Sequence, residues 1–556
     1  MSAPDLIIFN GRLFRGSLPG NAYLPGSAAG PAVADAPTAV AVAGDRIAAV
    51  GSDAAVTATG GDRTALIDAQ GGLLSAGFDD AHIHFRMGSL ALLGVDLFGI
   101  HDLSEIQAAI RRYASAHPDL PWVIGRGWMY AAFPGGMPTR EQLDAIVADR
   151  PTFIDCYDGH TGWANTKALQ AAGITRDTPD PVGGGIVRDP ATGEPTGALK
   201  ESATHLVEEL QPTPDEDRTL DAIRTALTLA AKAGLTSVQD AWSDPSEFDL
   251  FGRLAASDEL TLRLRLAMPL EPGLDSQACA ARLDEYEAAV APWANHPWLR
   301  GGVLKAFADG VVEARTASLL EPYATEATRG APNFAPGELR ERVALAHKSG
   351  WQVETHAIGD AAVRDALDAY EALGPDEARH RHHRIEHMET VDPADMGRFG
   401  ALGVVASFQP YHADPDPADI ALFERELGPE RAGRGWPWRS IHAAGGVLAF
   451  GSDWPVVPFD PFLALHGAVT RTTADGTPQG GAVPNERLGI ADALSAYTVG
   501  SALAGRGETE RGVLRPGKLA DLIVLDRDIL AEGASAILGS RVTLTVVGGR
   551  VVHREI

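Results

Sequence analysis

Eight short β-rich runs, separated by stretches of helical pattern, are the feature that most constrains the fold of this chain. Strands that alternate with helices build a parallel sheet, and eight such units close into a (β/α)₈ barrel. The first run ends at His82 and His84, and the others span residues 235–240, 262–268, 302–307, 352–356, 383–387, 404–408 and 447–453. We therefore predict an α/β protein with a TIM-like barrel.

Both ends of the chain have β-rich sequence. Residues 5–14 predict a hairpin with a tight turn at Asn10-Gly11, and residues 38–51 predict another that turns at Gly44-Asp45. Strand-like sequence returns near the far end, at residues 520–525 and 544–552. The two ends together are expected to form one small β-sandwich domain.

The domain boundaries follow from these patterns. We expect the composite β-sandwich at residues 1–74 and 511–556 and the barrel at residues 75–510, with a loop at residues 15–37. Residues 85–234 are too long for one connection between a strand and a helix, so they predict an inserted lid or specificity subdomain after the first barrel strand. Within it, helices are expected at residues 103–116 and 140–148, and a hairpin at residues 182–189.

Composition excludes several classes of protein. The chain has 47 basic and 74 acidic residues and a net charge of −27, which disfavours a nucleic-acid partner. No apolar run is long enough for a membrane span, and the first residues lack the pattern of a signal peptide. Cys156 and Cys279 are too few for a disulfide framework, so we expect a cytoplasmic protein. With nucleic acid and membrane disfavoured, a small-molecule substrate is the expected partner.

Residues that bind metal ions lie at the ends of five of the expected strands. The carboxyl ends of barrel strands meet at one mouth, where active sites form. Imidazole and carboxylate groups suit zinc and similar divalent ions. The candidate ligands are His82, His84, Lys305, His356, His387 and Asp453.

Lys305 is unusual in this set because an ammonium group cannot bind a cation. Burial lowers the pKa of a lysine, and the neutral amine takes up CO₂ to form an anionic carbamate (N6-carboxylysine). Such a group could bridge two ions about 3.5–4 Å apart. The alternative is a buried Lys305 that pairs with Asp309.

Eight sequence motifs together cover nearly the whole length of the chain. They lie at residues 77–84, 158–165, 195–201, 305–310, 356–360, 384–387, 451–455 and 512–521. As an ordered set they resemble the amidohydrolase superfamily, and within it the type-3 group that includes N-substituted formamide deformylases. Ala76 departs from this pattern, which usually has proline before the Gly-Phe pair.

The resemblance implies a site and a reaction. Its metal ligands would be His82, His84, His356 and His387, with Lys305 matching the family lysine. Asp453 would be both a ligand and the proton shuttle, and we count Asp453 and His387 as the catalytic residues. A metal-bound hydroxide would attack the carbonyl carbon, and Asp453 would pass the proton to the leaving nitrogen. One or two ions, most simply Zn²⁺, are expected, and a homodimer is implied by resemblance only.

The expected activity is hydrolysis of a C–N bond in an amide, N-acyl or formamide substrate. Hydrolysis of carboxylic or carbamate esters, or of cyclic amides, is the alternative on the same site, because the ligands do not determine the leaving group. A binding protein without activity on this scaffold is a third hypothesis, which the complete ligand set disfavours.

Four further residues are candidates for substrate binding: His160, Trp163, Trp128 and Asp309. Within the insert, the segment from Asp158 to Trp163 is polar and rich in glycine, and His160 could donate a hydrogen bond to a substrate carbonyl. A packing role is the alternative for both tryptophans.

The ligand candidates have structural alternatives too. His82 and His84 could be a structural pair on one strand, His356 a buried core histidine and Asp453 a helix cap. Another cluster of histidines is expected to be exposed or to pack, at positions His380, His382 and His383.

Overall fold

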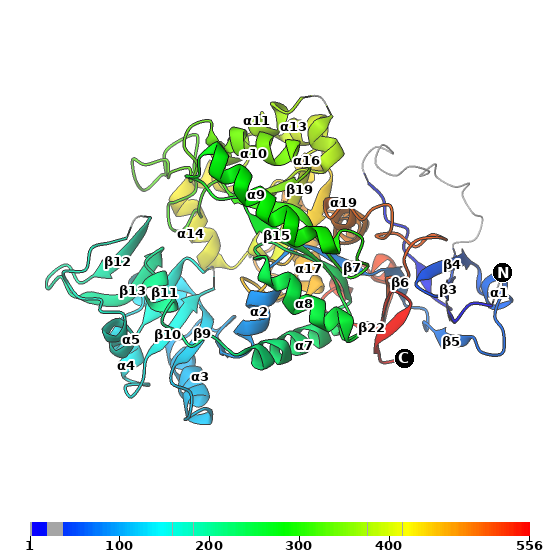
Figure 1. Cartoon of the computed structure of the whole chain (residues 1–556), viewed down its shortest axis with the longest axis horizontal. Coiled ribbons are helices and arrows are strands. Elements are labelled where there is room, and N and C mark those ends of the chain that lie inside the picture. Colours follow the sequence, from blue (N-terminus) through cyan, green and yellow to red (C-terminus); the bar gives the residue numbers. More distant parts are fainter. Residues whose placement is uncertain (1–2, 19–36, 158, 182, 375, 414) are drawn as a thin grey trace. The chain divides into compact units, whose positions relative to one another are not determined.

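The computed structural model describes residues 3–18, 37–157, 159–181, 183–374, 376–413 and 415–556. The chain divides into two compact units. The larger unit comprises Met1–His84, Leu227–Asp453 and Phe459–Ile556, and the smaller comprises Phe85–Ala226 with Trp454–Pro458. In Figure 1 the smaller unit is mostly the cyan part of the chain.

The larger unit contains the expected barrel, an eight-stranded sheet in the order β20-β19-β18-β17-β16-β15-β14-β7. Every neighbouring pair in it is parallel, and the backbone N–H of Asp453 donates to the carbonyl of His82 at 2.6 Å, which links the last strand to the first. The TIM-like barrel is thus confirmed. Its strands are β7 (Phe78–Ile83), β14 (Leu235–Asp240), β15 (Arg263–Pro269), β16 (Leu299–Phe307), β17 (Gln352–Ala357), β18 (Arg384–His387), β19 (Val405–Phe408) and β20 (Leu448–Phe450).

Burial explains why these segments are strands and the intervening ones helices. Strand β17 is buried at every position, as expected for a parallel strand that is covered on both faces. The following helix, α11 (Asp360–Glu371), buries Val363 and Leu367, four residues apart on one face. Further helices of this unit are α8 (Ser246–Ala256), α9 (Ser276–Val290), α10 (Glu338–Lys348), α13 (Met396–Leu402), α14 (Pro417–Leu427), α16 (Trp438–Ala443), α17 (Pro461–Thr470), α18 (Ile490–Ser495) and α19 (Ser501–Ala504).

The chain termini supply two more sheets, ordered β4-β3-β1-β5 and β2-β6-β21-β22-β23. Residues from both ends share one apolar core, which includes Leu6, Val40, Leu74, Leu522 and Leu544. The strands are β1 (Leu6–Phe9), β2 (Arg12–Leu13), β3 (Ala39–Ala43), β4 (Arg46–Gly51), β5 (Ala65–Asp68), β6 (Leu73–Ala76), β21 (Leu522–Leu525), β22 (Val542–Val547) and β23 (Arg550–Arg554).

One of the two expected hairpins at the start of the chain is wrong. Strand β1 pairs with β3 and β5, whereas β2 pairs with β6 in the other sheet, so Asn10-Gly11 carries the chain between sheets. Both edges of β1 are already paired, and this leaves none for β2. The hairpin that turns at Gly44-Asp45 is confirmed as β3 and β4, which are antiparallel. Most of the expected loop at residues 15–37 lies outside the described residues.

The smaller unit is built on a six-stranded sheet, ordered β12-β13-β11-β10-β9-β8, with α3 and α5 beside it (Figure 1). Side chains alternate between the faces of β10, so Ile154 packs in the cluster with α3 and Phe153 in the cluster with α5. Its elements are β8 (Val95–Asp96), α3 (Leu103–Ala116), β9 (Val123–Trp128), α4 (Arg140–Asp144), β10 (Thr152–Cys156), β11 (Thr161–Ala164), α5 (Thr166–Ala171), β12 (Gly184–Arg188) and β13 (Pro195–Glu201).

The local expectations for this segment are confirmed in part. Helix α3 has the expected bounds, and α4 is shorter than expected. The stretch expected to be a hairpin is instead one strand, β12, whose antiparallel partner is β13, further along the chain. Val182, at the start of the expected hairpin, lies outside the described residues.

The described residues contain no helix long and apolar enough to cross a membrane. Cys156 and Cys279 are both buried.

Candidate metal centre

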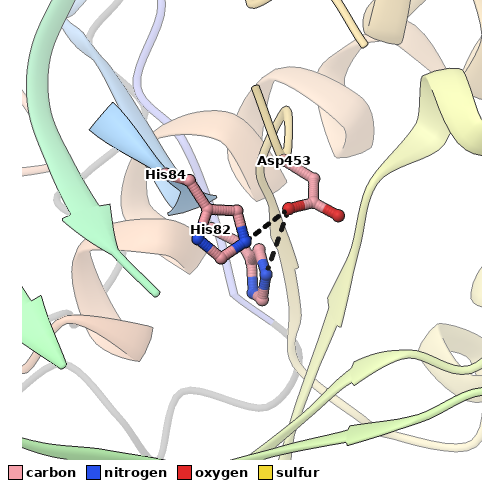
Figure 2. Close-up of side chains that lie close together, drawn as sticks. All are labelled: His82, His84 and Asp453. Atoms are coloured by element: carbon pink, nitrogen blue, oxygen red, sulfur yellow. Dashed lines mark ion pairs between the residues drawn. The ribbon is translucent and has the colours of Figure 1, made fainter. Parts of the chain in front are cut away.

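His82, His84 and Asp453 converge at the carboxyl end of β7 (Figure 2). The Nε2 atoms of His82 and His84 lie 3.4 and 3.1 Å from the Oδ1 atom of Asp453. His82 and His84 are two residues apart, as the period of a strand requires if both side chains are to share one face. Asp453 follows β20, so the pair of strands that closes the barrel brings the three side chains together.

The backbone that joins these strands is tightly constrained. A Cβ atom on Gly451 would lie 2.5 Å from the backbone nitrogen of His82, so only glycine allows this approach. Asp80 Oδ1 accepts hydrogen bonds from the backbone N–H groups of His82 and Ser452, at 3.1 and 3.0 Å. Burial raises the pKa of Asp80 to about 7, although these hydrogen bonds oppose the shift.

A buried carboxylate faces the other nitrogen of His82. The Nδ1 atom lies 2.9 Å from Glu386 Oε2, and both side chains are almost completely buried. This partner favours a proton on Nδ1 and leaves Nε2 to face Asp453 as the ligand atom. Burial and the Lys305 charge lower the pKa of His82, but attraction by Glu386 and Asp453 outweighs them and raises it to about 9.

Arg384 holds the Glu386 carboxylate in place. Its Nε atom lies 2.6 Å from Glu386 Oε1, and its Nη2 atom contacts Glu354, all three side chains being fully buried. Burial favours the neutral form of Glu386, but Arg384 and His82 outweigh it and lower the pKa to about 2. Glu386 is therefore an ionised group beside a metal ligand.

Lys305 lies inside the barrel beside His82. Its Nζ atom is 3.2 Å from His82 Nε2 and 4.7 Å from the ring centre of Phe307. Burial lowers the pKa of this amine, as expected from the sequence.

Asp309, the alternative partner of Lys305, binds backbone groups of other segments instead. The carboxylate of Asp309 accepts hydrogen bonds from the backbone N–H groups of Ser318, Ile358 and Gly359, at 2.8 to 3.0 Å. Burial raises the pKa of Asp309 to about 7. Among the described residues Lys305 and Asp309 form no ion pair, and substrate binding by Asp309 stays a prediction.

His356 and His387 are the remaining expected ligands, and both are buried at strand ends. Their ring centres are 4.6 Å apart, and the ring of His387 is 4.9 Å from that of His82. His356 Nε2 lies 3.2 Å from the carbonyl oxygen of Gly310 and 3.6 Å from Asp309 Oδ1. The structure therefore places both histidines next to the centre, while their ligation stays a prediction.

The backbone of His387 is strained. Its φ is +74°, and that of Asp453 is +60°, in the left-handed region that side chains with a Cβ atom disfavour. Such strain gathers at functional sites because the surrounding structure must hold it. Burial lowers the pKa of the His387 imidazole well below its usual value, which keeps the ring neutral.

His412 is a member of this group that the sequence analysis missed. It lies in a short 3₁₀ segment (Pro410–Ala413) after β19, with Nε2 3.6 Å from Asp453 Oδ2. Its ring is stacked on that of His387, with centres 5.8 Å apart and an angle of 7°. A signal was present, because His412 follows the end of the seventh expected strand by four residues.

These residues fit a divalent metal ion. His82, His84 and Asp453 form one group whose ligand atoms lie within 4.8 Å of one another, and His387, His412 and Asp453 form another. His387 Nδ1 and His412 Nε2 are buried and have no hydrogen-bond partner among the described residues. Imidazole nitrogens and carboxylate oxygens are donors that zinc prefers.

The candidate substrate residues of the smaller unit have local partners. Trp128 and Trp163 are fully buried in its core, where their Nε1 atoms donate to the carbonyls of Ile154 and Thr139 at 2.9 and 2.8 Å. The structure therefore gives both rings a packing role, and their contact with substrate stays a prediction.

His160 is about a quarter exposed and pairs with Glu201, with its Nδ1 atom 2.9 Å from Glu201 Oε2. Asp158, at the start of the expected loop, lies outside the described residues. Contact of His160 with substrate also stays a prediction.

The other histidine cluster is structural. His383 is fully buried, with its Nε2 atom 3.0 Å from His347 Nδ1 and its ring stacked on Tyr370. His382 Nε2 lies 3.4 Å from Glu508. The structure gives these side chains packing and pairing contacts, in agreement with the packing role that the sequence suggested for this cluster.

Two curated relatives are similar over most of the chain. Protein LONG AFTER FAR-RED 3 of Arabidopsis thaliana is 32% identical over 479 residues, which cover 84% of this chain and 79% of that protein. N-substituted formamide deformylase of Arthrobacter pascens is 28% identical over 454 residues, which cover 80% and 82%.

A solved structure agrees with these similarities. An uncharacterized metal-dependent hydrolase from Pyrococcus furiosus aligns with a TM-score of 0.69 and 25% identity, covering 94% of this chain and 99% of that one. The family model for the amidohydrolase family matches residues 65–553, which include the barrel and all the candidate ligands. The chain therefore belongs to the amidohydrolase family.

Proposed function

We propose that this chain is a metal-dependent hydrolase that cleaves a C–N bond in an amide, N-acyl or formamide substrate. The observation that carries the proposal is the position of Asp453. Its carboxylate contacts two histidines at the end of one strand at 3.1 and 3.4 Å and lies 3.6 Å from a third on another segment. A carboxylate in such a site can accept a proton from water and return it to a leaving group.

The metal would be held by His82, His84 and Asp453, and zinc is the ion that these donors suit best. When bound, a divalent ion polarises a carbonyl oxygen and lowers the pKa of water. Glu386 orients His82 through Nδ1 and so keeps Nε2 directed at the centre.

Asp453 has the proton-transfer role. Burial alone would raise its pKa, but attraction by His82 and His84 outweighs burial and holds the pKa well below its usual value. The carboxylate is thus ionised and accepts the proton of the attacking water. Breakage of the C–N bond then needs a proton on the departing amine, and Asp453 supplies it.

The similarity to an N-substituted formamide deformylase supports a C–N substrate. Esters and cyclic amides are the alternatives on the same site. A binding protein without activity is disfavoured, because the candidate ligands are all present and lie together in the barrel.

Four further features belong to the proposal. Burial lowers the pKa of the Lys305 amine, and this favours its carboxylation. We also propose that the insert at residues 85–234 selects the substrate, that the protein works as a homodimer and that it is cytoplasmic.

The test is a panel of matched substrates with the purified protein. Each formamide or N-acyl amine is paired with the ester of the same shape, and the metal content is measured by elemental analysis. We expect a bound transition metal, loss of activity with a chelator, and a larger acceleration over the uncatalysed reaction for the amide of each pair than for the ester. The control is Asp492→Asn, a carboxylate that lies outside the ligand groups on α18. A larger acceleration for the esters, no hydrolysis of any amide, or activity without metal would contradict the proposal.

A further inference from the structure

Trp242 is the one exposed tryptophan among the residues that the structure describes. Its exposed fraction is 41%, although tryptophan side chains are highly buried on average. Trp242 follows the last residue of β14 by two positions, so it stands at the face of the barrel where active sites form. A large apolar ring in this place is available to a bound molecule.

The ring of Trp242 packs against Phe307, the last residue of β16. The two ring centres lie 5.3 Å apart at an angle of 63°, edge to face. Lys305 and Phe307 are two residues apart on β16, so both side chains point into the barrel, where Lys305 lies beside His82. The ring of Phe307 is 5.0 Å from that of His356. Trp242 is therefore connected through one ring to the candidate metal centre.

The backbone on both sides of Trp242 is fixed to neighbouring strands. The N–H of Ala241 donates to the carbonyl of Ile83 at 2.7 Å, and the N–H of Ser243 donates to the carbonyl of Ala267 at 2.9 Å. These carbonyls belong to β7 and β15, the two strands that flank β14 in the sheet. A molecule that binds to the ring would not have to order this segment first, and this lowers the entropic cost of binding.

The chemistry of the two rings favours a neutral aromatic partner. Phe307 is itself only half-buried, so both rings keep surface that the protein does not cover. Aromatic rings prefer stacked or edge-to-face aromatic neighbours. The Lys305 amine already lies 4.7 Å from the centre of the Phe307 ring, which disfavours a positively charged group of a substrate at the same ring.

We propose that Trp242 and Phe307 form an aromatic platform that binds an aromatic group of the substrate close to the bond that is cleaved. The inference rests on the proposed function and deepens it, because it names the substrates as amides that carry an aryl group within a few bonds of the C–N bond. It also makes Trp242 a specificity-determining residue of the barrel itself, in addition to the selectivity proposed for the insert.

Two pairs of amides test the aromatic platform with the purified full chain. N-(2-phenylethyl)formamide and N-ethylformamide differ by a phenyl group on the amine side of the scissile bond. N-ethyl-3-phenylpropanamide and N-ethylpropanamide differ by a phenyl group on the acyl side. We expect the wild type to have the higher kcat/KM on the phenyl member of at least one pair. Trp242→Ala should lose that preference by a factor on the order of tenfold, while kcat/KM on the members without phenyl and the metal content stay nearly unchanged.

Two further variants separate the aromatic contact from a general effect on the fold. Trp242→Phe keeps an aromatic ring and should retain part of the preference. The matched control is Trp293→Ala, because Trp293 is half-buried in a short 3₁₀ segment (Ala291–Trp293) that leads into the amino end of β16, away from the strand end that carries Phe307. Its removal should leave the preference for phenyl unchanged. If Trp242→Ala does not fold, Trp242→Leu replaces it, since leucine keeps apolar bulk without an aromatic ring.

The results distinguish the aromatic platform from the proposed function. No preference for phenyl in the wild type, a preference that survives in Trp242→Ala, or an equal loss on both members of a pair would overturn the platform and leave the proposed function intact. Cleavage of none of the four amides would count against the proposed function, and dissociation constants of the same amides, measured by calorimetry, would then test the platform. Tighter binding of a phenyl member that Trp242→Ala abolishes would support it, and equal binding of both members would refute it.

Discussion

Replacing Glu386 by glutamine is expected to weaken metal binding at the His82 side of the centre. Glu386 does not face the ion itself but lies 2.9 Å from the Nδ1 atom of His82. Glutamine keeps the shape and one oxygen but loses the charge that orients and polarises the imidazole. Loss of such a partner lowers metal affinity by about 10- to 100-fold.

The variant is expected to lose free energy of metal binding and, separately, free energy of folding. A tenfold change in affinity corresponds to about 1.4 kcal/mol, so the loss of binding free energy is about 1.4–2.7 kcal/mol. Glu386 also pairs with Arg384 at 2.6 Å, and both are fully buried. Removing one partner of a buried pair costs about 3–5 kcal/mol of folding free energy. Because Arg384 keeps its contact with Glu354, we expect the loss of folding free energy to lie near the lower end of this range.

Glu354→Gln is the matched control. Glu354 is equally buried and pairs with the same arginine, but no ion pair joins it to His82 among the described residues. It should therefore lose a similar amount of stability and keep its metal affinity. Metal affinity is measured by competition with a chromophoric chelator, and stability by denaturant unfolding of the metal-free proteins. Equal metal affinities in the two variants would show that Glu386 acts on the fold alone and would refute this reasoning.

Three further predictions concern other residues. Asp453→Asn should lower kcat by about 10²–10⁴-fold, because an amide cannot accept the proton; a rate near that of the wild type, at equal metal content, would assign the shuttle to another group. His160→Ala should impair kcat/KM on bulky substrates while elemental analysis shows unchanged metal, and a loss of metal would contradict a substrate role. Burial lowers the pKa of His383 to about 3, so the unfolded state binds more protons below pH 6.5 and stability falls as the pH falls from about 6.5 towards 3. Between pH 6.5 and 5 the loss of folding free energy caused by His383 amounts to roughly 2 kcal/mol. His383→Phe removes the titrating imidazole and should therefore make the folding free energy depend less on pH. Denaturant unfolding at the two pH values measures this dependence, and an unchanged dependence would refute the assignment.

Local sequence patterns were sufficient for much of this protein. Strand β14 and helix α3 have the expected bounds, because apolar periodicity and turn residues act over a few neighbouring positions. The expected ligands also lie where a parallel barrel must bring them, since the carboxyl ends of its strands meet at one mouth. That rule needs only the order of the strands, so His82 and Asp453 could be assigned to one site from opposite ends of the barrel sequence.

Contacts between distant segments were not predictable in this way. Asn10-Gly11 has the sequence of a hairpin turn, but competition for the edges of β1 makes it a crossing between sheets. Tertiary structure likewise determines that Lys305 does not pair with Asp309. Backbone N–H groups of other segments donate hydrogen bonds to the Asp309 carboxylate.

His412 and Glu386 show the same limit at the metal centre. His412 is separated from Asp453 by a helical excursion, and Glu386 reaches His82 across the barrel, so neither contact leaves a periodic signal in the chain. Residue type and strand order determine which groups can reach the mouth of the barrel. Which nitrogen faces which oxygen depends on side-chain packing and buried charge, and these exist only once all eight strands have come together.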